Sequence, residues 1–358
     1  MSQQRSPDLP GRLGHPAMSL KDDPRADPRL IALMEPLGLA DAHQPLPFSH
    51  ESPLSEIIDF ISTIEEGFEL LFSGIFHDLP SVEGVVSTSE TIQGIDGNEI
   101  ELFLHRPADT HGPLPGILHL HGGGMVLLGA DGPGYVRWRE ELAATGLVVV
   151  GVQFRNGAGR LGTHPFPAGL NDCISALHWM HEQRERLGIS KIVVSGESGG
   201  GNLSIATTLS AKREGRLNEI DGVYAQCPYI SNAYATPLPE LTSLYENNGY
   251  FLGEELMALM AQMYDPSGLH ATDALAWPYY ASIDELRGLP PHVISVNELD
   301  PLRDEGLAHY RKLATAGVSA SARTVNGTSH AGDCIFRTAI PEAYESTIRD
   351  INSFACSL

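Results

Sequence analysis

Hydrophobic and polar positions follow two different rhythms along this chain. From about residue 84 onward, short runs rich in Val and Ile alternate with longer segments in which apolar residues recur every three or four positions. The first pattern predicts strands at 84–93, 99–105, 116–120, 147–154, 191–195, 222–229, 292–297 and 319–325. The second pattern predicts helices at 134–145, 168–186, 199–212, 304–316 and 340–354.

The order of these elements predicts the class of fold. A hairpin-type loop at 94–98 joins the first two strands, and after it strands alternate with helices. Such alternation implies parallel crossover connections, and continuous apolar strands imply a sheet that is covered on both faces. The sequence therefore predicts an α/β fold with a mostly parallel eight-stranded sheet flanked by helices.

Residues 1–83 precede the predicted sheet and have a helical pattern. Apolar residues such as Ile57, Ile61 and Phe68 recur at helical spacing within 55–76, with glutamates between them. A second apolar helical stretch, around 235–270, interrupts the alternation of strands and helices. Two interpretations stay open: these segments form a helical cap over a catalytic domain at 84–358, or they are ordinary helices packed on the core.

The stretch Gly196-Glu197-Ser198-Gly199-Gly200 follows an apolar strand and leads into a helical pattern. A Gly-x-Ser-x-Gly motif at such a strand-to-helix turn is typical of a nucleophile elbow. Glycine is needed where the turn leaves no space for a side chain, and the helix N-terminus favours negative charge at the serine. The motif predicts that Ser198 is a catalytic nucleophile; the alternative is a glycine-rich turn with an ordinary serine.

A second glycine-rich turn, His121-Gly122-Gly123-Gly124, ends the strand at 116–120. Acyl transfer places negative charge on the former carbonyl oxygen, and backbone N–H groups must point at that oxygen. Gly123 and Gly124 are the expected donors from this loop, and Gly199 is the expected third donor. We expect His121 to brace the loop by hydrogen bonding, with Gly122 as part of the motif. The alternative is a flexible surface turn.

A general base and its supporting carboxylate are expected downstream of Ser198. Asp300 follows the strand at 292–297, and His330 follows the strand at 319–325. Both positions lie just beyond the carboxyl ends of strands, where open parallel sheets place their ligands. The order Ser, Asp, His is that of the α/β-hydrolase triad. Glu298 and Asp304 compete with Asp300, but Asp304 is expected to begin a helix as a first-turn acid.

Composition limits the partners of this chain. Its 45 acidic and 23 basic residues give a net charge of −22, which argues against nucleic acid and anionic membrane. No signal peptide and no run of about 18 apolar residues is visible, so we expect a cytoplasmic protein without stable membrane insertion. The four cysteines form no Cys-x-x-Cys pair and suit no zinc site. We therefore expect reduced thiols and no bound metal.

Taken together, these motifs resemble the hormone-sensitive-lipase family of α/β-hydrolases. The resemblance rests on 121–124, the elbow at 196–200, the stretch at 300–306 and His330, with a further similar segment at 164–168 followed by Asp172. The stretch Gly196-Glu197-Ser198-Gly199-Gly200-Gly201-Asn202 departs from the usual Gly-Asp-Ser-Ala-Gly-Gly of the family. It is more similar to the bacterial brefeldin A esterase branch. The resemblance covers roughly 85–358.

This resemblance implies a carboxylesterase for short to medium acyl chains that needs no cofactor. It also implies a helical cap, an oxyanion loop with room for bulky or tertiary alcohols, and a tendency to form homodimers. We expect a small-molecule ester as substrate, and a macrolactone belongs to that class. Two alternatives stay open: a small-molecule receptor on a hydrolase scaffold, although such receptors have lost the histidine, and an amidase or thioesterase with the same triad.

Overall fold

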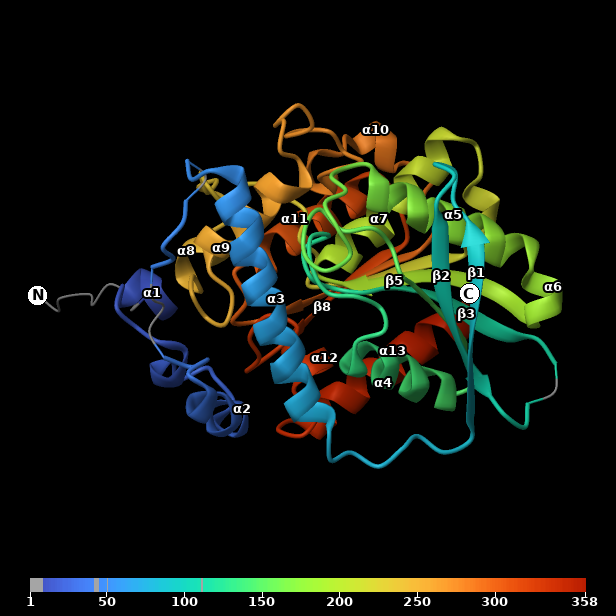
Figure 1. Ribbon diagram of the computed structural model, residues 1–358, viewed down its shortest axis with the longest axis horizontal. Coiled ribbons are helices and arrows are strands. Elements are labelled where there is room, and N and C mark those ends of the chain that lie inside the picture. Colours follow the sequence, from blue (N-terminus) through green and yellow to red (C-terminus); the bar gives the residue numbers. More distant parts are fainter. Residues whose placement is uncertain (1–8, 42–44, 50, 111) are drawn as a thin grey trace, which may run out of the picture.

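The computed structural model describes residues 9–41, 45–49, 51–110 and 112–358. Its centre is one eight-stranded sheet with the strand order β1-β2-β4-β3-β5-β6-β7-β8 (Figure 1). The strands are β1 Val85–Gln93, β2 Glu99–Pro107, β3 Leu114–Leu120, β4 Val148–Val152, β5 Ile189–Glu197, β6 Gly222–Gln226, β7 His292–Asn297 and β8 Ala320–Val325. The predicted fold class is thus confirmed.

The direction of the strands follows from their connections. β1 and β2 pair antiparallel across a short turn, and β2 also pairs antiparallel with β4. Strand pairs from β4 to β8 are parallel, because each connection contains helical segments that cross over the sheet. As a result, the carboxyl ends of β3, β5, β6, β7 and β8 meet at one edge.

Helices cover both faces of the sheet (Figure 1). One face carries α4 Pro133–Ala144 and α13 Pro341–Ser357, and the other carries α5 Ala168–Glu182, α7 Gly199–Arg213 and α11 Arg303–Thr315. The shorter helices are α6 Arg184–Leu187, α10 Ile283–Leu286 and α12 Gly332–Ile335. The predicted helix at 168–186 is divided into α5 and α6 around Gln183.

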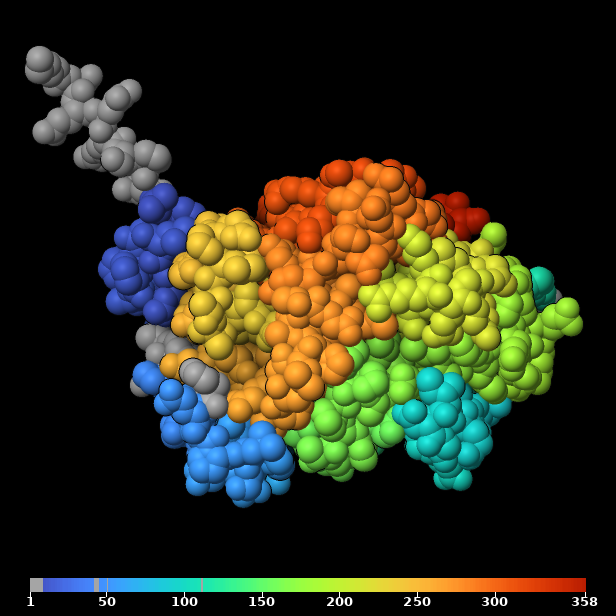
Figure 2. All heavy atoms as spheres, turned by 90° about the horizontal axis from the view of Figure 1, so that it is seen from above, coloured from blue at the N-terminus to red at the C-terminus, as the bar shows by residue number. Residues whose placement is uncertain are grey.

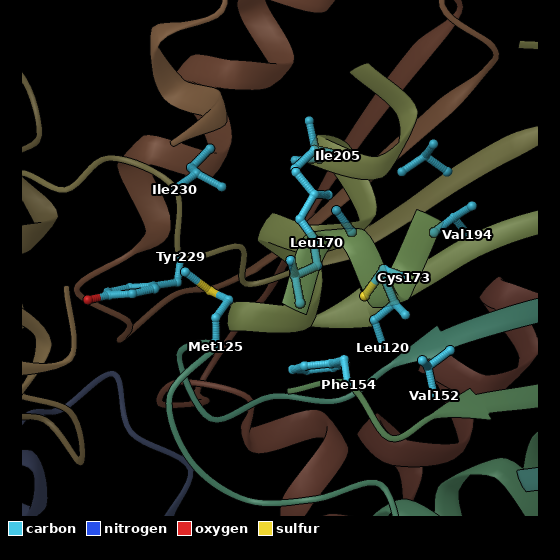
Figure 3. Close-up of a cluster of buried hydrophobic side chains, with 14 of the residues drawn as sticks. Leu120, Met125, Val152, Phe154, Leu170, Cys173, Val194, Ile205, Tyr229 and Ile230 are labelled. Carbon is cyan, nitrogen blue, oxygen red and sulfur yellow. The ribbon is translucent and has the colours of Figure 1, made fainter. Parts of the chain in front are cut away.

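The hydrophobic core lies between the sheet and these helices. Figure 3 shows Leu120 and Val194 from the strands packed against Leu170 and Cys173 of α5 and Ile205 of α7. All five side chains are buried. Burial of each large aliphatic side chain stabilises the fold by roughly 1.5–3 kcal/mol. This packing fixes the strands, and therefore the turns at their carboxyl ends.

A helical cover lies over the carboxyl edge of the sheet. It contains α1 Gly11–Gly14, α2 Pro28–Met34, α3 Leu54–Phe76, α8 Ser243–Glu246 and α9 Glu254–Tyr264, with 3₁₀ turns at Leu20–Asp22 and Glu35–Leu37. Figure 2 shows the N-terminal segment against the region of α8 and α9, where Arg25 forms ion pairs with Asp23 and Glu246. Division of the chain into a cap at 1–83, with an insertion around 235–270, and a catalytic domain stays a prediction.

None of the helices in the described ranges combines the length and apolar character that crossing a bilayer demands.

Candidate active site

Ser198 occupies a strained turn between β5 and α7. Its φ of 57° and ψ of −116° are values that residues with a side chain rarely adopt. The turn is tight: a Cβ on Gly200 would lie 1.8 Å from the carbonyl oxygen of Leu120, and one on Gly196 would lie 2.4 Å from it. Only glycine fits at these two positions, so the motif exposes the serine at the edge of the sheet.

His330 and Asp300 reach Ser198 from two other strand ends. Nε2 of His330 lies 3.0 Å from Oγ of Ser198, and Nδ1 of His330 lies 2.8 Å from Oδ2 of Asp300. The other carboxylate oxygen of Asp300 accepts the N–H of Leu302 at 2.9 Å. Asp300 is fully buried and the His330 side chain is 8% exposed. The three residues therefore form a continuous hydrogen-bonded relay that opens only at the serine.

The two competing acids have other partners. Asp304 lies in the first turn of α11, where it accepts hydrogen bonds from the hydroxyl of Thr242 and the N–H of Ser243. Glu298 accepts the N–H of Gly327 at 2.8 Å. Of the three carboxylates considered from the sequence, Asp300 is the one that contacts His330.

A buried polar network holds the loop that carries His330. The side-chain amide of Asn297, the last residue of β7, donates to Thr328 at 2.7 Å and to Asp333 at 2.8 Å. Its carbonyl oxygen accepts the N–H of Ala331, which has a positive φ of 53°. Thr347 of α13 donates to the other oxygen of Asp333 at 2.6 Å. These bonds fix the backbone on both sides of His330, and the sequence alone does not predict them.

The glycine loop after β3 passes directly over the elbow. A Cβ on Gly199 would lie 2.5 Å from the nitrogen of Met125 and 2.8 Å from that of Gly124. Gly123 has a φ of 99°, and its carbonyl oxygen accepts the N–H of Leu127 at 3.0 Å. Among the described residues, no hydrogen bond occupies the N–H groups of Gly123 and Gly124. The N–H groups of both glycines are therefore unpaired within the described structure, on a loop that contacts the elbow.

Glu197 braces this loop from the elbow side. One carboxylate oxygen accepts the N–H of Gly122 at 2.7 Å, and the other lies 3.1 Å from Nε2 of His119. His121 donates from Nδ1 to the carbonyl oxygen of Gly122 at 2.8 Å and stacks on Phe154, with ring centroids 4.0 Å apart. Burial lowers the pKa of His121 to about 3, so the ring is neutral. The loop is held by side chains on both sides.

Another buried carboxyl group, that of Glu305, anchors the segment that leaves β6. It accepts the N–H of Ile230 at 2.6 Å and the hydroxyl of Tyr234 at 2.9 Å, and it contacts the hydroxyl of Ser231. Burial raises the pKa of Glu305 to about 8, although these hydrogen bonds act in the opposite direction. Glu305 therefore stabilises the segment of chain that connects β6 to the helical cover.

The space in front of Ser198 is a small apolar pocket of about 90 Å³. The glycines 122–124, Ser198 and His330 form one side of it. Large apolar and aromatic side chains from the cover and from α4 also line it, namely Phe68, Phe72, Phe76, Tyr135, Leu256 and Met260. Such a lining suits a neutral, apolar ligand with one polar group at the serine.

One set of metal-type donors occurs in the described part of the chain, namely Cys227, Asp300 and His330. Two of its three members form the relay with Ser198, so their ligand atoms already have hydrogen-bond partners. Burial raises the pKa of the Cys227 thiol well above its usual range, and thiolate is the form that binds metal. All four cysteines are free thiols.

The chain is similar to known proteins over most of its length. The sequence profile of a family with the α/β hydrolase fold matches residues 117–332. A solved structure of brefeldin A esterase, described as a bacterial homologue of human hormone sensitive lipase, is 50% identical, with a TM-score of 0.94 over 97% of this chain and 98% of that one. The esterase Est22 is 34% identical, with a TM-score of 0.84 over 94% and 98% of the two chains.

A curated relative gives a similar result. Carboxylesterase NlhH of Mycobacterium tuberculosis is 31% identical over 271 residues, which cover 73% of this chain and 80% of the relative.

Proposed function

This chain belongs to the family of α/β hydrolases that is homologous to hormone-sensitive lipase, and we propose that it is a serine carboxylesterase working through an acyl-enzyme on Ser198. The observation that carries the proposal is the relay of 3.0 Å and 2.8 Å from Ser198 through His330 to Asp300. A nucleophile, a base and a group that orients the base are the parts that acyl transfer requires.

The geometry supports the following sequence of steps. His330 accepts the hydroxyl proton at Nε2 while Oγ of Ser198 forms a bond to the ester carbonyl carbon. The tetrahedral intermediate collapses, the bond to the alkoxide breaks, and His330 returns the proton to the leaving alcohol. Water then attacks the acyl-enzyme with His330 as base, and the acid leaves as Ser198 regains its proton. Asp300 keeps the imidazole oriented and stabilises its charged form.

Backbone N–H groups stabilise the negative charge in both steps. Gly123, Gly124 and Gly199 are the proposed donors, because the loop and the elbow approach each other at these residues. Each such donor contributes about 10²–10³ to the rate in comparable sites. Glu197 has a positioning role, since it holds the N–H of Gly122 and thereby the start of the donor loop.

The proposed substrates are neutral esters with short to medium acyl chains. The apolar lining of the pocket and the net charge of −22 both disfavour anionic substrates. The oxyanion loop contains no side chain between Gly122 and Gly124, which leaves room for bulky or tertiary alcohols. Similarity to a brefeldin A esterase supports a macrolactone as a further candidate.

Hydrolysis of p-nitrophenyl butyrate by wild type and Ser198→Ala tests this proposal. We expect activity in the wild type and a loss of about 10⁴-fold or more in the variant. Ser195→Ala is a matched control, because Ser195 is a buried β5 serine three positions from the nucleophile. The mechanism is refuted if Ser198→Ala keeps full activity, or if Ser195→Ala loses as much as Ser198→Ala does.

Matched ester, thioester and anilide substrates separate the reaction classes that share a triad. We expect the ester to have the highest kcat/KM, since expulsion of an amine demands more help from the acid. A higher value for the thioester or the anilide would transfer the proposal to that class. Stoichiometric binding of a small molecule with no turnover of any substrate would indicate a receptor.

A further inference from the structure

Helix α3 separates the catalytic pocket from a larger groove on its other side. Phe68, Phe72 and Phe76 point into the catalytic pocket. The groove is lined by the face that contains Gly67, Leu71 and Gly74, which are spaced four and three residues apart. One helix thus forms a wall of two neighbouring cavities.

The groove is open, apolar and large. Its volume is about 1110 Å³, and its far wall comes from α2 and the turn at 35–37, which lie beside α3 in Figure 1. At its mouth, Leu70 is 76% exposed and Leu37 is 51% exposed. Asp78 is the charged residue among the described lining positions. An exposed apolar surface with one acidic group suits a neutral hydrophobic chain better than a fatty acid anion.

The two glycines place no side chain in the groove. A Cβ on Gly67 or on Gly74 would meet no described atom within 4 Å, so neither glycine is required by close packing. Glycine in the middle of a helix lowers its stability by about 1 kcal/mol relative to alanine. In α3 the two glycines carry this cost, and a larger side chain at either position would fill part of the groove.

The groove adjoins the active site through shared walls. Phe68 and Leu256 line both the catalytic pocket and the groove, and their side chains form the boundary between the two. The pocket itself, at about 90 Å³, holds only the part of an ester next to the reacting carbonyl. A longer substrate therefore needs additional space, and the groove provides it beside the same two residues.

We propose that the groove binds the distal end of a long, neutral hydrocarbon chain of an ester whose carbonyl lies at Ser198. The proposal rests on the proposed esterase function and extends its substrates beyond short chains. Phe68 and Leu256 move apart to admit the chain between α3 and α9. The remaining carbons then replace water along Leu71 and the two glycines, and each buried methylene strengthens binding about fourfold.

The experiment compares p-nitrophenyl butyrate with p-nitrophenyl laurate in three proteins. In Gly74→Phe the new ring points into the groove, so we expect kcat/KM for laurate to fall about tenfold or more while that for butyrate changes less than twofold. Gly74→Ala is the matched control, because it strengthens the helix but leaves the groove open. We expect its ratio of laurate to butyrate activity to equal that of the wild type.

A second variant tests whether the effect of Gly74→Phe comes from blocking the groove rather than from a local disturbance at residue 74. Gly67→Phe blocks the groove one position from the shared residue Phe68, and it should lower the laurate ratio at least as much as Gly74→Phe does. A wild type without laurate activity would overturn the proposal, and so would parallel losses on both esters. Dissociation of a dimer by Gly74→Phe in sedimentation, with the chain-length ratio unchanged, would assign the groove to a second copy instead.

Failure of this proposal is distinguishable from failure of the esterase mechanism. Butyrate hydrolysis and phosphonate labelling of Ser198 report on the relay, which lies on the other side of α3 from the glycines. If both persist while the ratio of laurate to butyrate activity is the same in the groove variants as in the wild type, only the groove assignment is wrong.

Discussion

Two regions of this molecule contain glycines that differ in the space available around them. Around Ser198 the backbone packs so closely that a Cβ on Gly200 would lie 1.8 Å from a carbonyl oxygen. On the outer face of α3, a Cβ on Gly67 or Gly74 meets no described atom within 4 Å. The first region has no space for a methyl group, whereas the second has space that a methyl group would barely reduce.

The difference separates chemistry from substrate selection. Hydrogen bonds to a developing charge must be held within a few tenths of an ångström, so their supporting turns are buried and tightly packed. The helical cover contacts only the hydrocarbon parts of the proposed substrate, which require shape rather than exact direction. We therefore expect substitutions near the sheet edge to reduce rate or folding, and substitutions on outer α3 to change preference.

Beyond loss of the nucleophile itself, the largest effect is expected from Asp300→Asn. The amide cannot fix the same imidazole tautomer or stabilise its charge, so kcat for p-nitrophenyl butyrate should fall about 10⁴-fold with the fold retained. Asp304→Asn is the control, since Asp304 bonds to Thr242 and Ser243 rather than to His330. Equal losses in the two variants would show that the carboxylate beside His330 has no special role.

Gly200→Ala tests the tightness of the elbow. Its methyl group would overlap the carbonyl oxygen of Leu120 and approach that of His121 to 2.7 Å. Both are backbone atoms of β3 and its loop, which cannot move without disturbing the sheet. We expect a loss of more than about 4 kcal/mol in the free energy of unfolding, measured by urea denaturation, or no soluble protein. An unchanged urea midpoint would contradict this description of the turn.

Much of the sheet could be predicted from the sequence. Each of the eight predicted strands is present, because continuous apolar runs between turn residues have few other stable conformations in a domain of this size. Ser198, His330 and Asp300 could be selected because each follows a strand whose end was visible. Their meeting in space follows from the parallel order of those strands, while their catalytic roles stay predictions.

Other features depend on contacts between distant residues and leave little signal in the sequence. Asn297 binds Asp333, 36 positions away, and only the packing of β7 against the loop after β8 makes that bond possible. A polar residue ending an apolar strand is the one hint it gives. The groove beside α3 depends on how α2 packs, so the sequence alone does not predict that Gly67 and Gly74 line a groove.

The buried Glu305 allows a smaller, pH-dependent effect. Its pKa in the folded state, about 8, is above the usual 4.5, so the folded protein binds the proton more tightly than the unfolded chain does. The resulting contribution to stability is complete below pH 4.5 and is lost as pH rises to about 8. Glu305→Gln cannot ionise, so its stability relative to wild type should improve by roughly 3 kcal/mol between pH 5 and pH 8.

Urea unfolding of both proteins at several pH values measures this difference. Glu298→Gln is the control, because Glu298 lies close by in sequence and accepts its hydrogen bond from Gly327 at a partly exposed site. A constant difference between Glu305→Gln and wild type from pH 5 to pH 8 would mean that Glu305 is ionised throughout, held by the donors of Ile230 and Tyr234.

The smallest effect, and the one of opposite sign, is expected from Gly67→Ala. The methyl group meets open space and removes conformational freedom from the unfolded chain, so the free energy of unfolding should rise by about 0.5–1 kcal/mol. Gly84→Ala is a sharp control: a Cβ there also meets no described atom, but its φ of 74° disfavours alanine, so stability should fall. If both substitutions stabilise the protein, backbone conformation does not distinguish them. If both destabilise it, α3 needs glycine for its own structure. The glycines of α3 would then be structurally required, as those of the elbow are.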